Sequence, residues 1–353
     1  MTFMLTAEQR QFGTALHDLL ADAGVPAAAR AWAAGDHGPG LAIWRKLAGA
    51  GVTALTAPES RGGLGAGPVD LVVACEELGH HPLPGPVAES VAAVPVLLAE
   101  LADSGRPAGL ADPGGLAGPA GWLAALGSGD LIATLAMPPG VPYALDADAA
   151  GLVLLADAGG IWRGRPGTCL RSADPARRLF EVGRADPLAG AGAVASAAAA
   201  AARAYGTLAG AALLLGAGRG LLDASVAHAK TRQQFGRPVG AFQAVQHALA
   251  DVLIGLEFAR PLAYAAAIAL GSGAPTADRD VSAARVACAD AARRAARTAL
   301  QVHGAIGYTS ECDVSLWLAK VRALSSVWGS QAEHRSVVLA ALTSDPDRTG
   351  PWS

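Results

Sequence analysis

The chain has 353 residues, enough for two or three domains, and only 16% of them are charged, well below the share in an average soluble protein. Its net charge of -3 and its scattered arginines exclude the basic patch that nucleic-acid-binding proteins use. So little charged surface indicates that apolar surface is buried between subunits.

The N-terminus and the cysteines indicate a cytoplasmic protein. Glu8 and Arg10 stand where a signal peptide would be apolar, and no uncharged apolar run reaches the roughly 18 to 20 residues that span a bilayer. We therefore expect no membrane span. The four cysteines have no C-x-x-C spacing, so we expect reduced, mostly buried thiols and no metal site: Cys75, Cys169, Cys288 and Cys312.

The first third of the chain has the pattern of helices. Residues 6–24 begin with Thr6 as a candidate N-cap and Gln9 three residues later, and they end at a glycine. Further helices are predicted over 40–51 and 67–80. In the last of these, one apolar stripe is expected from Val69, Val72, Val73 and Leu78. We assign residues 1–115 to an N-terminal helical domain.

The amino-acid composition changes near residue 105, where Gly and Pro become frequent. Short apolar runs separated by turn residues follow and predict strands at 131–137, 151–157, 160–164 and 177–183. We expect a shortened middle β domain over residues 116–190.

Long helical segments fill the rest of the chain, 191–353. The Ala-rich run 191–206 is either a linker or the start of the first helix. Helices are predicted near 205–231, 241–272, 277–303 and 311–343, the last broken at Gly329. Long helices with short connections are typical of an antiparallel bundle. The expected fold is therefore mainly α, with a helical domain, a small β domain and a four-helix bundle.

Two motifs carry a family resemblance. Residues 229–260 read AKTRQQFGRPVGAFQAVQHALADVLIGLEFAR, and residues 301–324 read QVHGAIGYTSECDVSLWLAKVRAL. Together with residues 44–80 and the order of the three domains, they resemble the acyl-CoA dehydrogenase family. The resemblance implies bound FAD, an acyl-CoA thioester as substrate, and electron-transfer flavoprotein as electron acceptor.

The same residues suit a flavin dinucleotide. Arg232 lies where a helix gives way to a loop, and its planar guanidinium can donate two bonds to a pyrophosphate. Phe235 can wall off a ring, while Gln243 and Gln246 open the next helix, where amides and free N–H groups reach sugar and phosphate. Gln301, Gly304 and Gly307 lie near a later helix end, where small residues permit close approach of a ligand, and Ala305 stands where the family's cofactor loop has the second residue of a Gly-Gly pair.

Each of these residues also has a plain interpretation. A loop arginine is usually solvated, a phenylalanine usually belongs to a core, and a glycine after a helix usually caps it. The joint spacing favours the cofactor site. We interpret His228 and His247 as ordinary helix residues and not as ligands.

The resemblance also shows a loss. The family's general base, a glutamate that removes the α-proton while the β-hydrogen leaves as hydride to flavin N5, most often lies in a Tyr-Glu-Gly-Thr turn. Here the aligned positions are Val327, Trp328, Gly329 and Ser330, so an indole without a basic lone pair replaces the base. Ser330 stays a candidate cofactor contact.

No other position in the sequence offers a clear substitute for the missing general base. Some family members carry the base near the start of the first bundle helix, but Tyr205 and Gly206 stand there. Glu257 and Glu311 are nearby carboxylates that are better explained as surface or capping residues. Trp328 either fills the vacated acyl pocket, which we favour, or shapes a pocket for a wide, ring-containing acyl group.

The losses follow a pattern. In the family, one chain supplies the flavin-ring side, and the Arg and Gln-Gly segment of a neighbouring chain holds the pyrophosphate and adenosine. The middle segment 133–151 lacks the polar residues that bond the flavin ring in the family. The residues that would bind the FAD of a neighbouring chain remain. We therefore expect a non-catalytic subunit that completes the FAD site of a homologous, glutamate-bearing subunit, similar to the α2β2 enzymes of actinobacterial steroid side-chain oxidation.

Three alternatives remain open. In the first, the chain is a self-sufficient homotetrameric dehydrogenase with an unconventional base. In the second it is a scaffold homologue that binds neither flavin nor CoA, and in the third it is a flavin oxidase of the same fold. The sequence does not fix the acyl group, fatty or steroid, because the pocket depends on helix positions.

Overall fold

The computed structural model describes residues 5–103 and 118–344. Its N-terminal part is helical, as predicted. The α-helices are α1 (Ala7–Ala21), α2 (Val25–Ala33), α3 (Gly38–Gly49), α4 (Pro68–His80), α5 (Val94–Asp103) and α6 (Gly118–Ser128). A π-helical turn, η3 (Glu89–Ala93), leads directly into α5.

Local sequence sets the start of α1. The Thr6 hydroxyl accepts a hydrogen bond from the Gln9 N–H (3.2 Å), and the Gln9 side chain accepts one from the Thr6 N–H (3.1 Å), so the predicted cap is confirmed. The predicted single stripe on α4 is wrong. Nearly every residue of α4 from Leu71 to His80 is buried, because other helices cover it on all sides.

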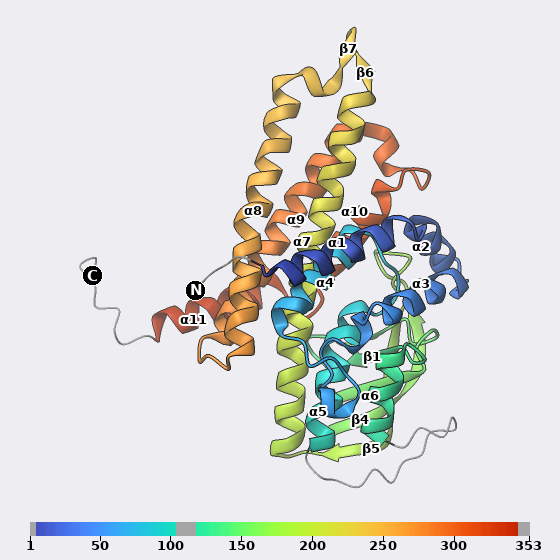
Figure 1. Ribbon diagram of the computed structural model, residues 1–353, viewed down its shortest axis with the longest axis vertical. Helices are drawn as coiled ribbons and strands as arrows, with labels where there is room; N and C mark the ends of the chain where they lie inside the picture. Colours follow the sequence, from blue (N-terminus) through green and yellow to red (C-terminus); the bar gives the residue numbers. More distant parts are fainter. Residues whose placement is uncertain (1–4, 104–117, 345–353) are drawn as a thin grey trace, which may run out of the picture.

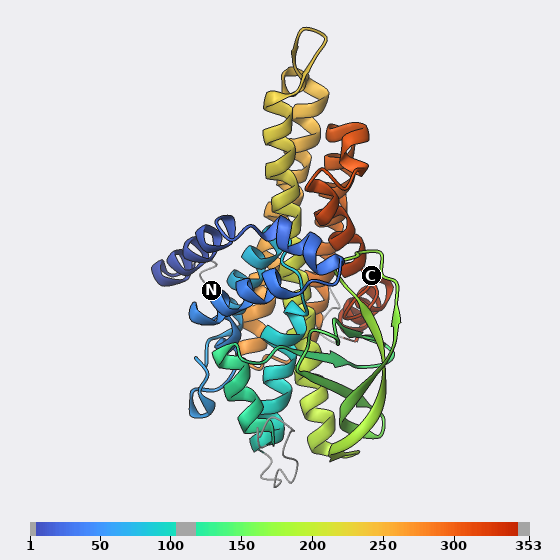
Figure 2. The same ribbon diagram turned by 90° about the vertical axis from the view of Figure 1, so that its right-hand side faces the viewer.

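A five-stranded sheet lies beside the helices (Figure 2). Its strands are β1 (Ala133–Ala136), β2 (Ala144–Leu145), β3 (Leu152–Asp157), β4 (Gly160–Leu170) and β5 (Leu179–Gly190), in the order β1-β3-β4-β5-β2. Only the β1–β3 pair is parallel among the pairings of these five strands. The small β unit is therefore present. The start of the segment that we expected to be β is a helix, however, because α6 packs its Trp122 and Leu123 into the helical core.

The C-terminal helices form the bundle (Figure 1). They are α7 (Ala193–Thr231), α8 (Gln243–Gly271), α9 (Ala277–His303), α10 (Val314–Leu324) and α11 (Gln331–Thr343). The Ala-rich run is the first part of α7, so the linker interpretation is wrong and the first helix starts twelve residues before the predicted 205. The break at Gly329 is confirmed, because α10 and α11 flank it.

Close backbone contacts hold α4 against α7. A Cβ on Gly79 would lie 2.2 Å from the Leu213 carbonyl oxygen, and a Cβ on Gly216 would lie 1.9 Å from that of Glu76. Only glycine permits this approach at either position. The N-terminal helices and the bundle therefore share one core.

Helices α7 and α8 are long and apolar enough, by length and composition alone, to cross a membrane. This is weak evidence, because the buried core helix of a soluble protein passes the same test. The apolar window of α7 is 67% buried inside the molecule. All four cysteines are free; Cys75 and Cys288 are buried, whereas Cys169 is exposed.

Candidate functional site

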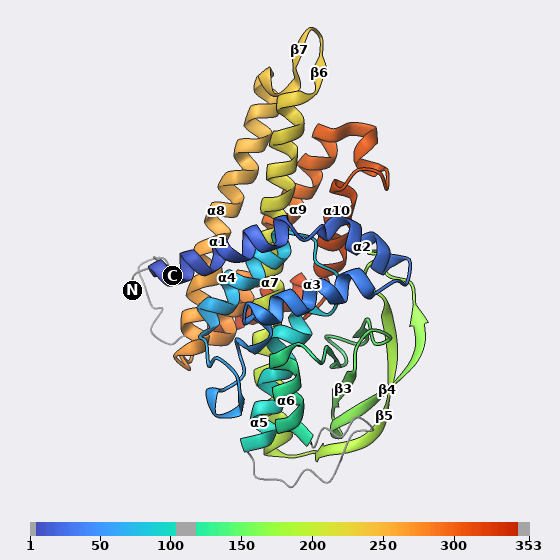
Figure 3. The same ribbon diagram turned by 45° about the vertical axis from the view of Figure 1, so that its right-hand side comes forward.

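The first group of predicted residues lies at the far tip of the bundle, on an arm formed by the end of α7, the hairpin β6 (Gln233–Gln234) and β7 (Arg237–Pro238), and the start of α8 (Figure 3). Arg232 is the exposed C-cap of α7, as predicted. Its side chain forms no ion pair within residues 5–103 and 118–344, so its guanidinium is free for an anion. Phe235 has a positive φ of 50° and is 91% exposed.

A groove of about 520 Å³ runs along this arm. Phe235 and Phe242 line it from the hairpin side, and Gln301 lines it from α9. The rings of the two phenylalanines are arranged edge to face, with their centroids 6.1 Å apart. Gln243 is the first residue of α8 and is exposed, as expected.

The remaining predicted residues, on the arm and just after α9, are placed less uniformly. The Gln246 amide donates to the Gly240 carbonyl (2.9 Å), so it stabilises the loop before α8 and is partly committed. Gly304 caps α9 with a φ of 63°, and Ala305 follows it, exposed. Gly307 is buried.

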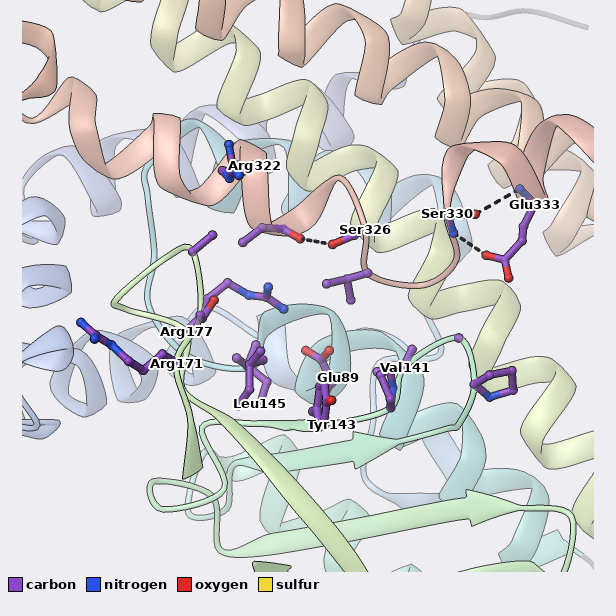
Figure 4. Close-up of a pocket in the computed structure, with 18 residues that line it drawn as sticks. Glu89, Val141, Tyr143, Leu145, Arg171, Arg177, Arg322, Ser326, Ser330 and Glu333 are labelled. Carbon is purple, nitrogen blue, oxygen red and sulfur yellow. Dashed lines mark hydrogen bonds between the residues drawn. The ribbon is translucent and has the colours of Figure 1, made fainter. Parts of the chain in front are cut away.

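A second cavity, of about 720 Å³, lies between the β unit and the bundle (Figure 4). Its lining residues come from four regions: Glu89 from the N-terminal part, residues between Pro139 and Leu145 and between Arg171 and Leu179 from the β unit, and residues between Arg322 and Glu333 from the bundle. Ser330 lies on its rim but acts as the N-cap of α11. Its hydroxyl accepts from the Glu333 N–H (3.2 Å), and the Glu333 carboxylate accepts from the Ser330 N–H (2.6 Å).

Trp328 is only 3% exposed and lines a small separate cavity that shares Glu89, Arg177 and Val327 with the second cavity. Its backbone has a positive φ of 60°, which is uncommon for a bulky residue and persists because the turn is held on several sides. His334 Nε2 donates to the Trp328 carbonyl (2.8 Å), and Arg285 donates to the Val327 carbonyl (2.9 Å). The indole is therefore a packed core side chain, and its filling of a vacated acyl pocket stays a prediction.

The structure adds a carboxyl group that the sequence reasoning missed. Glu89 begins the π-helical turn η3, is 2% exposed, and points into the second cavity (Figure 4). Burial raises its pKa above the usual range, while the Arg177 guanidinium partly offsets this effect. The Trp328 indole faces the same carboxyl and also lowers its pKa slightly. No sequence motif marks Glu89. It is recognised only by its burial and by the direction of its side chain into the cavity.

The groove on the arm and the second cavity are far apart. A Cβ on Gly206 of α7 would touch the Trp328 ring, whereas Arg232 directly follows the last residue of α7. From Gly206 to Thr231 the helix rises about 38 Å. A single dinucleotide does not span this distance, so the arm of one chain cannot complete the cavity of the same chain.

Other candidate residues have structural roles. Glu257 is 52% exposed and pairs with Arg260 at 2.8 Å. Glu311 is exposed. His228 stacks on His303, with ring centroids 4.3 Å apart, and His247 is exposed on α8.

Comparisons with known proteins match nearly the whole chain. The acyl-CoA dehydrogenase N-terminal domain model matches residues 6–105, and the C-terminal domain model matches residues 189–343. The chain is 31% identical over 336 residues to acyl-CoA dehydrogenase IpdE2 of Mycobacterium tuberculosis, covering 94% of this chain and 96% of the relative.

Solved structures show the same fold. The ChsE4-ChsE5 complex from Mycobacterium tuberculosis superposes with a TM-score of 0.76 and 25% identity, covering 98% of this chain and 100% of that one. Butyryl-CoA dehydrogenase from Megasphaera elsdenii superposes with a TM-score of 0.78 and 20% identity, covering 97% and 100%.

Proposed function

Because the chain belongs to the acyl-CoA dehydrogenase family, whose members are oxidoreductases acting on CH–CH bonds, we propose that it is one of two different subunits of an FAD-dependent acyl-CoA dehydrogenase. In this proposal its arm completes the FAD site of the partner subunit. The observation that carries it is the arm itself: Phe235 is 91% exposed and lies between β6 and β7, the hairpin at the tip of the bundle (Figure 3).

The arm fits the phosphate end of FAD. Arg232 would hold the pyrophosphate through charge-assisted bonds, and Gln243 and Gln301 would bond the ribose and adenine edges. Gly304 and Ala305 present little side chain, so the ligand can lie close to the backbone. Phe235 would cover one face of a ring. Bound FAD would supply the hydride acceptor of the dehydrogenation.

The chain's own residues do not remove the α-proton at the usual position. Trp328 stands there, and its indole N–H can donate but cannot accept a proton. The glutamate of the partner subunit would therefore take the proton from the acyl-CoA, and electron-transfer flavoprotein would collect the electrons. The solved ChsE4-ChsE5 complex, which pairs two differently named chains, supports an assembly of this kind.

The test is co-expression with a homologous subunit that carries the glutamate. We expect a yellow complex that dehydrogenates an acyl-CoA, and Arg232→Ala should weaken FAD retention by roughly 1.5 to 3 kcal/mol, because a charge-assisted bond is lost. The matched control is Arg237→Ala, since Arg237 lies on the same hairpin but stacks on Phe242, 4.1 Å from the ring centroid. Equal loss of FAD from both variants, or from neither, would contradict the assignment.

A second candidate function is favoured by one observation, the Glu89 carboxyl in the cavity beside Trp328. In this alternative the chain is a self-sufficient dehydrogenase, and Glu89 replaces the missing base. Burial raises the pKa of the Glu89 carboxyl and so disfavours its carboxylate form, the form that acts as a base, which disfavours this role.

Single-chain turnover separates the two candidates. We expect the purified chain alone to show no acyl-CoA dehydrogenation, and Glu89→Gln to leave the activity of the two-chain complex within about threefold, since glutamine keeps the size of the side chain and the base comes from the partner subunit. Turnover by the chain alone that disappears in Glu89→Gln would instead establish the self-sufficient enzyme.

A further inference from the structure

Helices α1 and α4 lie side by side, and three histidines and a glutamate gather where the last part of α1 meets the C-terminal end of α4. His17 comes from α1, Glu77 and His80 from α4, and His81 directly follows α4. One ligand atom from each residue lies within 4.8 Å of the others. None of these residues belongs to the arm or lines the second cavity.

The spacing suits a tetrahedral metal ion. Zn²⁺ binds histidine nitrogen and carboxylate oxygen at about 2.0 to 2.2 Å, which places neighbouring ligand atoms about 3.3 Å apart. His17 Nδ1 lies 3.0 Å from Glu77 Oε2 and 3.4 Å from His81 Nε2. Little movement is needed for these three atoms to share one ion.

One atom, His17 Nδ1, lies at the centre of two short contacts in this cluster. A ring nitrogen has a single in-plane position for either a proton or a lone pair. His17 Nδ1 therefore cannot serve both Glu77 Oε2 and His81 Nε2, although both lie within reach. A cation at this point would accept all three lone pairs.

His80 supplies a second, independent indication. It is only 9% exposed, and its Nδ1 is buried with no partner in the part of the chain that the structure describes. Its Nε2 lies 2.9 Å from Asp223 Oδ2. A carboxylate that receives one ring N–H fixes the other nitrogen as a lone-pair donor, which is the usual outer arrangement of a metal-bound histidine.

The surroundings orient the glutamate and keep the local charge negative. Glu77 divides its oxygens: Oε1 accepts from Arg219 (2.8 Å), while Oε2 faces His17. Asp223 adds a second carboxylate, and Arg219 is itself shared with a third, Glu76. Glu76 is also bonded by Arg260, so two carboxylates, Glu77 and Asp223, contact the histidines directly against the one guanidinium, Arg219, that bonds Glu77.

The helix pair that carries the cluster is already fixed. Gln9 donates to Asp70 at 3.0 Å, which ties the start of α1 to the start of α4. A Cβ on Gly13 would lie only 3.2 Å from Val73, so the two helices are in close contact between this bond and His17. We propose that His17, Glu77, His80 and His81 bind one Zn²⁺ in a closed structural site that joins α1 to α4.

The test is Zn²⁺ binding by the chain without a polyhistidine tag, after removal of metal with a chelator. Titration against a chromophoric competitor should give one Zn²⁺ per chain and a raised thermal midpoint, because an ion that binds only the folded state stabilises it. Co²⁺ in place of Zn²⁺ should give the visible absorption of tetrahedral coordination.

Two variants and a control locate the ion. His17→Ala, whose side chain is 41% exposed, should weaken Zn²⁺ binding more than a hundredfold, while Asp223→Asn should weaken it by about 10- to 100-fold as an outer partner. His247→Ala, at an exposed position on α8, should bind as the unmodified chain does. Absence of stoichiometric binding, or binding that survives His17→Ala, would overturn the site.

Discussion

Trp328 is held between two parts of the chain that lie far apart in sequence. Its ring meets α7 at Gly206, where a Cβ would lie 2.6 Å from the ring, and at Gly210, where a Cβ would lie 3.5 Å away. The first distance is a clash, and the second is ordinary van der Waals contact. The indole therefore depends on one glycine and not on the other.

This difference gives a matched pair of variants. Gly206→Ala should destabilise the chain by about 1 to 3 kcal/mol, because the methyl group overpacks the site. Gly210→Ala should be neutral or stabilising by up to about 1 kcal/mol, since alanine favours the helix and meets no clash. Urea unfolding of both variants measures the difference, and equal stabilities would show that Trp328 is not packed as described.

At the level of single residues, the spacing of the motifs predicted positions correctly, whereas the sequence did not reveal which polar side chains would be buried together. Alignment to the family turn predicted that Trp328 replaces the base, and helix-end signals correctly placed Arg232 at the end of α7 and Gln243 at the start of α8. Glu89 was missed because it has no local motif, and the His17 cluster was missed although Glu77, His80 and His81 are close together in the sequence. Both arise from segments that only the tertiary fold brings together.

At the scale of elements, an ion network joins three helices. Glu76 of α4 is 4% exposed and accepts from Arg219 of α7 (3.0 Å), from Arg260 of α8 (2.9 Å) and from the Tyr264 hydroxyl of α8 (3.2 Å). Arg260 also pairs with Glu257, which is 52% exposed. One guanidinium thus has a buried and an exposed carboxylate partner.

We expect the two carboxylates to contribute very differently. Glu76→Gln should cost about 2 to 3 kcal/mol of unfolding free energy, somewhat less than a fully buried pair, because the arginine side chains stay 28% and 30% exposed. Glu257→Gln should cost less than about 1 kcal/mol, since solvent screens an exposed pair. Chemical denaturation measures both, and a larger loss in Glu257→Gln would contradict the network.

The predicted elements failed where packing overrides local signals. Residues 191–206 contain glycine and an alanine run, which left helix and linker equally open; buried Ala195, Ala198 and Ala202 show that contact with the rest of the molecule makes them helical. Helix α6 was hidden among Gly and Pro for the same reason. By contrast, α9 was predicted with its observed bounds, because its apolar spacing and its final glycine agree.

At the scale of the whole molecule, α8 is apolar on two faces. One face packs inward through Val252, Leu256, Ala259 and Ala263. The other carries Ile254, Phe258 and Leu262, spaced four residues apart and 53%, 75% and 42% exposed. A helix that is apolar all round is normally covered. Together with the exposed arm, this outer face supports assembly with another subunit.

The last prediction follows from that outer face. Phe258→Glu should leave the folding of the single chain within about 0.5 kcal/mol, because the ring is mostly in water, yet it should prevent co-purification with the partner subunit, since a charge would be buried without a counter-ion. Leu64→Glu is the control, because Leu64 is 51% exposed but lies outside α8 and the arm. Size-exclusion chromatography of the co-expressed chains measures assembly directly. A Phe258→Glu chain that still elutes with its partner, as Leu64→Glu should, would mean that α8 is not at the subunit interface and that the arm reaches the neighbouring FAD site by another packing arrangement.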